Sequence, residues 1–459
     1  MVSEFDSAFD RGRIPAHLVR EMMETRLTLL LNKARDSNHR YRMVELGLFP
    51  QTSTAHVAVN IFNQMICEHN MSYHQFSRPY VNYQLPPVVT PDAQFSKYMY
   101  HQMSGFWPEQ CEEISNELTL IPDVIKCRRS GCYASKELAI FVMLRRWHIA
   151  DNWEGVSKDL RRQRTWCILI YYEIFRLVVH YYRKCVRVLD YRRINPLLEQ
   201  WGQKMAEHCG TDTNVIFFTD GKPWKMSRLG RGRAIREICF AAGVTDVNLM
   251  QRAYYNGHYK YHGGKVQHVL QADGIAHSFT CPIRNHDALV LRNSSMLLML
   301  TSVFINGDPN QPAVTVTDKA YGRSAHFKPI HTEAELRMLA PADRVIAVNF
   351  DRRHKRPRLS VEDSFNQQVT KFPHTEVSKR HRITQGGRSN WNYLRCLWDT
   401  QTLFFNLFTC SAGTQVTGAL GVHPPSVHEY LYSCNNDLLI DVLLDDAEDN
   451  FLNGNDYYI

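Results

Sequence analysis

The sequence predicts an all-helical unit followed by a mixed domain of the α/β or α+β class. From Phe95 to about Leu198, apolar residues recur every three or four positions, as in helices that bury one face. At Thr213 the pattern changes to short runs rich in β-branched and aromatic residues, bounded by turn residues. Helical patterns return from Asp287 onward. The length of 459 residues leaves room for two or three domains with cores of their own.

Within this division each element has its own signal. The helical unit should contain helices at Glu109–Leu118, Ser135–Trp147 and Thr165–Leu189. Strands are expected at Val215–Thr219, Lys265–Gln271, Ile275–Thr280 and Val314–Thr317, and later helices at Asp287–Leu300, Arg358–Phe372 and Trp391–Leu407. Before residue 96, an amphipathic helix at Ile14–Arg35 and a proline-rich linker at 81–91 form an appendage. The expected segments are therefore 1–95, 96–210, 211–432 and an acidic tail at 433–459.

Composition excludes several classes of protein. With 44% hydrophobic and 22% charged residues the chain is not disordered as a whole. The longest apolar run, Cys167 to Tyr182, contains Glu173, Arg176 and His180, so we expect no membrane span. The first residues show no secretory signal, and the 12 cysteines are scattered without a CxxC pair. We therefore expect a nucleocytoplasmic protein with free thiols, Cys127 and Cys132 included.

The charge distribution suits a polyanionic partner. The net charge is +8, yet the final 25 residues contain seven acids and neither Lys nor Arg. The rest of the chain is therefore more basic than the total suggests, which is compatible with nucleic acid binding.

Two predicted strands run into an aspartate. Val215–Thr219 leads into Asp220-Gly221, and Val314–Thr317 leads into Asp318. A carboxylate at a strand end is held by a rigid sheet while facing the rim, as precise sites require. Taken singly, each aspartate equally fits a turn, and Asp287 equally fits a helix cap.

A longer set of motifs resembles the PIF/Harbinger-type transposases, which belong to the DDE superfamily of endonucleases. The matching residues are Asp220-Gly221, Tyr255-Asn256-Gly257-His258, Lys265-Val-Gln-His-Val-Leu270, Asp273-Gly274-Ile275, Asn285-His286-Asp287, Asp318 with Tyr321, Arg358-Leu-Ser-Val361-Glu362 and the closing Gly421-Val-His-Pro-Pro425. The resemblance covers roughly Phe95 to Leu431. Lys222, Asn366 and Asp363 depart from the family pattern.

The resemblance implies an α/β, RNase H-like mixed sheet with flanking helices. It implies catalytic roles for Asp220, Asp318 and Glu362, with Asp287 either in the same acidic cluster or capping a helix. These carboxylates would hold Mg²⁺ or Mn²⁺, as two ions, for phosphodiester cleavage. Glu376 competes with Glu362 for the third position, but Phe372 and Thr375 then replace the motif Arg and Val.

Basic segments are candidate DNA contacts, because phosphate neutralisation supplies most nonspecific affinity. They are Arg161, Arg162 and Arg164 before a long apolar helix, Lys225, Arg228, Arg231 and Arg233 after Asp220, and Arg352, Arg353, Arg356 and Arg358 in one basic run. The first group lies in a region that resembles the family's helix-turn-helix-like unit, although a plain core helix fits equally. The last group fits a nuclear-localisation run or a solvated loop.

Two functions follow from these patterns. The first is a metal-dependent DNA endonuclease or transposase that acts in the nucleus. The resemblance is compatible with a Myb-like partner protein and with an oligomer. The second is a domesticated, inactive DNA-binding or adaptor protein that keeps the fold. The complete set of acids favours the first, and the altered flanking residues Lys222 and Asp363 favour the second.

Overall fold

The computed structural model describes most of the chain from Ser96 onward. The described residues are 96–127, 130–230, 235–236, 247–285, 287–293, 295–375, 393–436 and 438. The helix expected at Ile14–Arg35, the linker at 81–91, Glu376 and nearly all of the acidic tail lie outside them.

The helical unit contains the three helices that the sequence predicts, each within one or two residues of the expected bounds. Its elements are α5 (Lys97–Ser104), α6 (Pro108–Glu117), α7 (Lys136–His148), α8 (Trp153–Leu160) and α9 (Arg164–Arg187). Serine caps fix two helix starts: Ser96 accepts a hydrogen bond from Met99 N at 3.3 Å, and Ser135 accepts one from Leu138 N at 3.2 Å.

The expectation that this unit is purely helical is wrong in one detail. A two-stranded antiparallel hairpin, β1 (Val124–Lys126) and β2 (Tyr133–Ser135), lies between α6 and α7. Cys127 N donates to Cys132 O at 2.8 Å beyond the paired residues, so the backbone groups next to the turn are satisfied. Both of these cysteines are free thiols, as expected.

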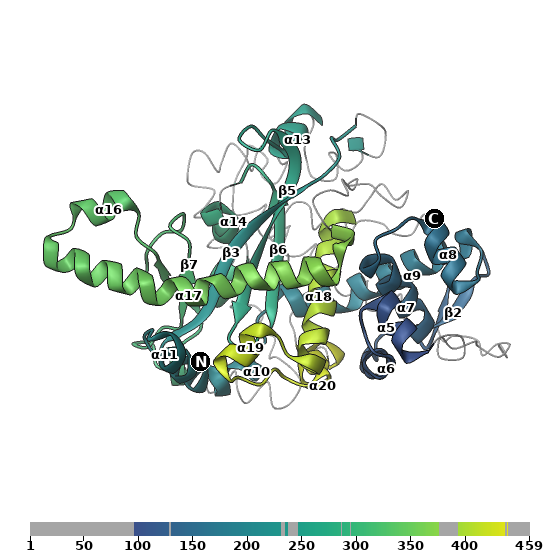
Figure 1. The fold of residues 1–459 in the computed structure, drawn as a ribbon, viewed down its shortest axis with the longest axis horizontal. Coiled ribbons are helices and arrows are strands. Elements are labelled where there is room, and N and C mark those ends of the chain that lie inside the picture. Colours follow the sequence, from purple (N-terminus) through teal and green to yellow (C-terminus); the bar gives the residue numbers. More distant parts are fainter. Residues whose placement is uncertain are drawn as a thin grey trace, which may run out of the picture.

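The second half is a mixed α/β domain built on a curled sheet with helices on both sides (Figure 1). Its strands are β3 (Val215–Lys225), β4 (Tyr255–Asn256), β5 (Tyr261–Gln271), β6 (Ala276–Pro282), β7 (Val314–Thr317) and β8 (Phe327–Pro329). The strand order is β6-β5-β3-β7-β8, and β4 pairs with the first residues of β5. The pairs β5-β6 and β3-β5 are antiparallel, whereas β3-β7 and β7-β8 are parallel.

Strand β3 extends beyond its predicted end. The sequence predicts that the strand stops at Thr219 and that Asp220-Gly221 forms a turn, but β3 continues to Lys225. The parallel pairing with β7 does stop at Thr219, which pairs with Thr317. The antiparallel pairing with β5 continues, and Asp220 pairs with His268. The turn interpretation of Asp220-Gly221 is therefore wrong, because the backbone groups of these two residues are paired with β5.

Connecting helices cover the sheet. They are α10 (Tyr191–Ile194), η2 (Asn195–Leu197), α11 (Leu198–Cys209), α13 (Val247–Ala253), α14 (Asp287–Asn293), α15 (Ser295–Thr301), η3 (Ile305–Gly307), α16 (Glu333–Met338), α17 (Pro341–Lys371), η4 (Pro373–Thr375), α18 (Tyr393–Ala412), α19 (Gln415–Leu420) and α20 (Val427–Asn435). The helix expected at Asp287–Leu300 corresponds to α14 and α15, which lie on either side of residue 294, a position outside the described ranges.

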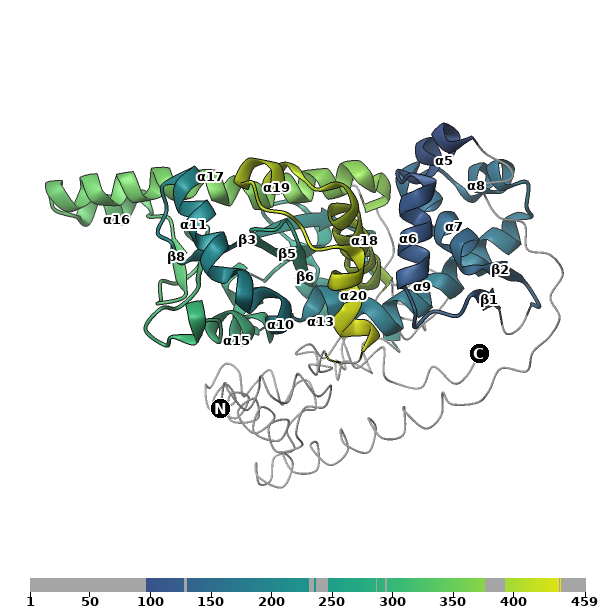
Figure 2. The same ribbon diagram turned by 90° about the horizontal axis from the view of Figure 1, so that it is seen from below.

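Helix α17 is much longer than the sequence predicts. We expect a helix to begin at Arg358, but α17 begins at Pro341 and includes the whole basic run 352–358. The loop interpretation of that run is therefore wrong. Figures 1 and 2 show that α17 crosses the sheet and that its first turns, with α16, project away from the body of the molecule.

The two halves share one core. Figure 2 shows α18 between the sheet and the helical unit, and α18 packs against both β6 and α9. Tyr171 of α9 and Tyr393 of α18 share a hydrogen bond of 2.9 Å between their hydroxyl oxygens, and Trp147 Nε1 donates to Tyr171 at 3.0 Å. Among the helices of the described ranges, none has the length and apolar character that crossing a bilayer requires.

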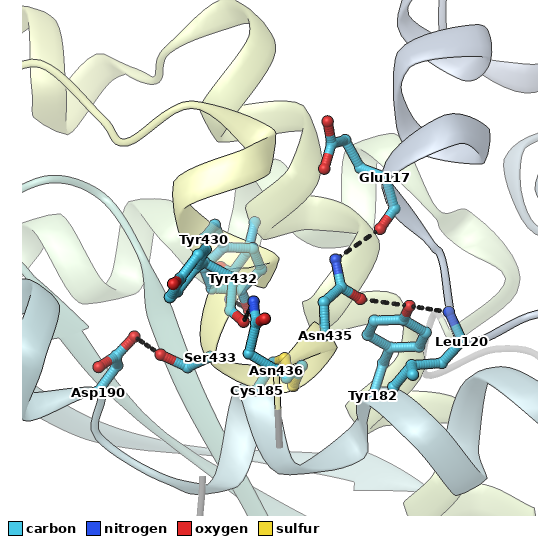
Figure 3. Close-up of a disulfide and its surroundings, with 12 residues drawn as sticks. Glu117, Leu120, Tyr182, Cys185, Asp190, Tyr430, Tyr432, Ser433, Asn435 and Asn436 are labelled. Carbon is cyan, nitrogen blue, oxygen red and sulfur yellow. Dashed lines mark hydrogen bonds between the residues drawn. A yellow bond between two sulfur atoms is a disulfide. The ribbon is translucent and has the colours of Figure 1, made fainter. Parts of the chain in front are cut away.

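A disulfide joins α9 to α20 (Figure 3). Cys185 and Cys434 are bonded although they lie 249 residues apart in the sequence. The expectation of free thiols is therefore wrong for this pair. Beside it, Tyr182 donates to Asn435 Oδ1 at 2.7 Å, and Asn435 Nδ2 donates to Glu117 O at 2.8 Å. Helix α20, whose last turns lie within the segment expected to be a tail, is thus attached to the helical unit.

Candidate active site

Asp220 and Asp318 lie side by side on neighbouring parallel strands. They directly follow Thr219 and Thr317, the last residues that pair β3 with β7. Neighbouring strands lie about 4.8 Å apart, so the register brings the two backbones together at this edge. Both side chains are half-buried. The resemblance implies that these two aspartates lie at one edge of the sheet, and the register is compatible with that, even though β3 itself continues.

Tyr321 lies among the acids of this edge. Its side chain is buried, and burial raises the pKa of Tyr321 well above its ordinary value. The negative charges of Asp287, Asp220 and Asp318 raise that pKa further. The phenol therefore stays protonated, and Gln267 Nε2 contacts its hydroxyl oxygen. One buried ring thus lies within electrostatic reach of three carboxylates.

Glu362 approaches from α17, on one face of β3. Its neighbours Val361 and Phe365 are buried, while Glu362 itself is half-buried, as its place beside the apolar face predicts. The charge of Glu362 raises the pKa of Lys222, although burial lowers that pKa more strongly. Because alternate residues of a strand share a face, Lys222 and Asp220 both lie on the side covered by α17.

Lys222 also contacts another residue that departs from the family pattern. Its Nζ donates to Asn366 Oδ1 at 2.9 Å, and it lies 5.8 Å from the centre of the Phe365 ring. Asn366 is one turn beyond Glu362 on α17. The two departures therefore form one contact, and it places an ammonium group beside the proposed third acid.

Asp287 lies on the opposite face of β3 from Asp220. A Cβ added at Gly221 would lie 2.4 Å from Asp287 Oδ1, so this carboxylate packs against the strand where Gly221 leaves room. Lys265 Nζ forms an ion pair with the same oxygen at 2.9 Å, and Gln267 Nε2 donates to Asp287 O at 3.2 Å. Asp287 is also the first residue of α14, so it is a helix-terminal acid whose carboxylate packs against β3 beside Gly221.

Sequence reasoning assigned no role to the neighbours of Asp287. Lys265, Gln267 and Tyr321 lie around its carboxylate and backbone, and all three belong to segments that resemble the family motifs. The available signal is the alternation on β5: Lys265 and Gln267 lie two residues apart in a strand and so share a face. His286, the preceding residue of the motif, lies outside the described ranges.

His268 pairs with Asp220 in the sheet but belongs to the core. Burial lowers the pKa of His268 to about 3, so its ring is neutral. Trp398 Nε1 donates to His268 Nε2 at 3.3 Å, which makes that nitrogen the acceptor. The ring also stacks on Phe365, with 4.0 Å between ring centres. His268 therefore supports the α17 side of the sheet.

The acids have the right donor chemistry for a hard divalent cation, because Mg²⁺ and Mn²⁺ prefer carboxylate oxygens. Asp220 and Asp318 share one level of the sheet. Within the part of the chain that the structure describes, however, no three His, Cys, Asp or Glu side chains are grouped closely enough to hold an ion. Lys222 and Lys265 lie beside two of the acids.

The predicted DNA contacts form separate groups. Arg161, Arg162 and Arg164 are exposed before and at the start of α9, where Arg164 pairs with Glu154 at 3.5 Å. Lys225 ends β3, and Arg228 Nη2 donates to Gln251 Oε1 at 3.4 Å.

The basic run of α17 lies elsewhere. Arg353 Nη1 donates to Gly210 O at 3.3 Å, close to the start of β3, and Arg352 beside it is exposed. The backbones of Arg356 and Arg358 belong to the same helix, whereas Arg231 and Arg233 lie outside the described ranges. Lys225 and Arg353 therefore lie toward opposite ends of β3.

Helix α9, the candidate recognition helix, is largely a core helix. Ile170, Ile174, Phe175 and Val178 are all buried along its length. Helix α8 separates α7 from α9, so the two helices are not joined by a single tight turn. On the described surface, the first turn of α9 and His180 are exposed, and the rest of the helix is buried or half-buried.

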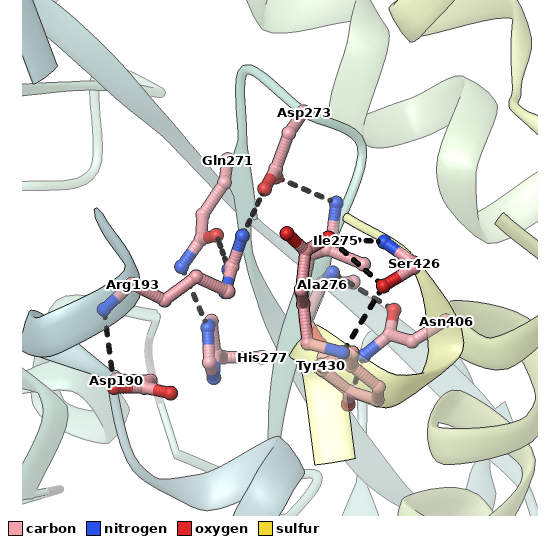
Figure 4. A network of polar contacts seen from close by, with 11 residues as sticks. Asp190, Arg193, Gln271, Asp273, Ile275, Ala276, His277, Asn406, Ser426 and Tyr430 are labelled. Atoms are coloured by element: carbon pink, nitrogen blue, oxygen red, sulfur yellow. Dashed lines mark hydrogen bonds and ion pairs between the residues drawn. The ribbon is translucent and has the colours of Figure 1, made fainter. Parts of the chain in front are cut away.

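The Asp273-Gly274 motif has a structural role far from the acids (Figure 4). It forms the β5-β6 turn, where Gly274 has φ +81°, a left-handed conformation that glycine adopts without strain. The buried Asp273 pairs with Arg193 and accepts from Ile275 N at 3.1 Å. Nearby, Asn406 Oδ1 accepts from Ala276 N at 2.9 Å. The network connects the hairpin to α10 and α18.

A comparison with protein-family models, curated proteins and solved structures yields no match for this chain.

Proposed function

We propose that the protein is a metal-dependent DNA endonuclease or transposase that cleaves phosphodiester bonds at the edge formed by Asp220, Asp318 and Glu362. The observation that supports this function best is the register of β3 and β7, which sets the two aspartates side by side. A sheet with an antiparallel part followed by a parallel part is also compatible with the RNase H-like fold that the motifs imply.

In this function, Asp220 and Asp318 would hold Mg²⁺ or Mn²⁺, and Glu362 would contribute from α17. When bound, such ions assist the attacking oxygen and stabilise the leaving oxygen. The bond from phosphorus to the attacking oxygen would form as that oxygen loses its proton, and the bond to the leaving oxygen would break as the leaving oxygen gains a proton. Lys265 offsets the charge of Asp287, and the buried, protonated Tyr321 lies within electrostatic reach of the acids.

A second function has an observation of its own. The Lys222 ammonium, held by Asn366 and attracted to Glu362, supplies a fixed positive charge where the first function requires a metal. An ammonium there would disfavour metal binding by charge repulsion. This contact favours a domesticated protein that binds DNA without cutting it.

Nicking of a labelled supercoiled or linear duplex separates the two functions. Purified wild type, Glu362→Gln and Glu376→Gln are compared with Mg²⁺, with Mn²⁺ and with EDTA. We expect nicking by the wild type and by Glu376→Gln. In Glu362→Gln the nicking rate should fall by about 100-fold or more. Thermal stability should change little, because Glu362 lies at the rim.

Two results would contradict the nuclease function or its residues. Active Glu362→Gln together with inactive Glu376→Gln would move the third acid to the other position. No metal-dependent nicking by any of the three proteins would favour the non-catalytic function. Lys222→Thr is then tested, because it removes the ammonium group beside Glu362. If Lys222→Thr nicks DNA, Lys222 is the residue that prevents cleavage in the wild type.

A further inference from the structure

The tip of the β4-β5 hairpin carries a cluster of aromatic rings that the proposed cleavage does not use. We define the aromatic tip as Tyr255, His258, Tyr259, Tyr261 and His262. Tyr255 is 43% exposed and Tyr259 is 45% exposed, which is high for such large side chains. Within the tip, Tyr259 and Tyr261 are stacked, with ring centres 5.6 Å apart and planes inclined by 25°, whereas His258 lies edge-on to Tyr259 with planes inclined by 72°.

The tip is held in shape before any ligand binds. Asn256 Oδ1 accepts hydrogen bonds from His258 N at 2.9 Å and from Tyr259 N at 3.1 Å, so the side chain fixes the turn between the strands. Gly263 N donates to Tyr254 O at 2.7 Å at its base. Because the backbone is already ordered, a ligand that stacks on Tyr259 does not need to order the loop.

Positive charge surrounds the rings. Lys225 Nζ lies 5.4 Å from the centre of the Tyr261 ring, and Lys260 is exposed next to Tyr259. Burial lowers the pKa of His262, and the charge of Arg228 lowers it further, so a third cation lies within reach of the tip. The segment 254–272 contains no acidic residue. Exposed rings beside lysines are the combination that binds unpaired nucleotides, with bases on the rings and phosphates near the lysines.

The tip lies at the end of the strand that carries Asp220. Lys225 pairs with Gly263 and is five residues beyond Asp220, a distance of about 17 Å along β3. We propose that the aromatic tip binds a single-stranded DNA segment next to the cleavage edge, which rests on the nuclease function proposed above. Duplex DNA does not fit the tip equally well, because its bases are already stacked on one another and offer no free faces to the rings.

Equilibrium binding to DNA tests this role without requiring cleavage. Fluorescence anisotropy of a labelled oligothymidylate is measured with the full-length protein in EDTA, and a duplex of mixed sequence is measured alongside. We expect Tyr259→Ala to weaken binding of the single strand about 5- to 150-fold, the range for loss of one base stack. Tyr259→Phe, which keeps the ring, should bind like the wild type. Binding of the duplex should change by less than the single strand in every variant.

Tyr98→Ala is the matched control. Tyr98 is 65% exposed on α5, so the variant removes an exposed tyrosine from another part of the molecule and should leave Kd unchanged. Equal loss of single-strand and duplex binding in Tyr259→Ala would overturn the stacking role, as would wild-type affinity in Tyr259→Ala or weak binding by Tyr259→Phe. Absence of single-strand binding by the wild type would overturn it as well.

The nicking assay is independent of these results. Single-strand binding that depends on Tyr259 in a protein that never nicks would support the tip and reject the nuclease. Metal-dependent nicking by a protein whose Tyr259→Ala variant binds normally would support the nuclease and reject the tip.

Discussion

Gly221→Ala tests whether Gly221 is required for the close approach of Asp287. The added Cβ would lie 2.4 Å from Asp287 Oδ1 and 3.0 Å from Asp287 Cγ, well inside van der Waals contact. Either the strand moves, or the carboxylate moves and its 2.9 Å ion pair with Lys265 is broken. Overpacking of this kind costs about 1–3 kcal/mol in the free energy of unfolding. Nicking activity, if present, should also fall, because Asp220 is the adjacent residue.

Denaturant unfolding followed by circular dichroism measures this cost. Gly257→Ala is the matched control, since no atom lies within 4 Å of a Cβ added there, and it should change stability by less than about 0.5 kcal/mol. The double variant Gly221→Ala with Asp287→Ala removes the clash, so the two substitutions should cost less together than the sum of their separate costs. Equal stability of Gly221→Ala and Gly257→Ala, or strict additivity of the double variant, would refute the close-approach explanation.

Two further predictions concern buried charges. Burial lowers the pKa of Lys371 to about 7 from an ordinary 10.5, so the folded protein loses this proton first and its stability should rise with pH across that window, by at most about 5 kcal/mol. In Lys371→Met the increase of the unfolding free energy with pH should be smaller by that contribution. Equal pH slopes of stability for the wild type and Lys371→Met in urea unfolding would contradict the lowered pKa of Lys371. Asp399 is buried and accepts from Arg183 Nε and Arg187 Nη2, both at 2.8 Å, so Asp399→Ala should cost about 3–5 kcal/mol in the same assay. Glu207→Ala, from the exposed pair with Lys204, should cost less than about 1 kcal/mol, and similar costs for both variants would contradict the role of Asp399.

Elements with a strong local pattern could be predicted from the sequence. Strand β7 has the predicted bounds Val314–Thr317, and α7 and α9 begin within one residue of expectation. In each case one periodicity dominates and the boundary residues agree with it. That Asp220 and Asp318 each come directly after a run of strand residues could be predicted in the same way, but their side-by-side position depends on the pairing of β3 with β7.

Features that depend on distant partners could not be predicted. Asp220-Gly221 has turn composition, and only the pairing with β5 keeps it in the strand. The basic run 352–358 has no apolar period of its own, so its helical state depends on the long helix that contains it. The bond between Cys185 and Cys434 joins positions too far apart in the sequence for any local signal to pair them.

Helix α17 connects the edge at which Glu362 lies to the helical unit. Its 31 residues span about 46 Å, and Glu362 lies about 14 Å from the end at Lys371. At that end, His148 Nδ1 lies 2.7 Å from Lys371 O, so the last turn of α17 is attached to the helical unit. A tilt of roughly 5° about this end would move Glu362 by about 1 Å relative to Asp220. Misplacement by about 1 Å can cost 100-fold in rate, so under the proposed nuclease function a shift of the helical unit would change the rate at the distant edge through this one helix.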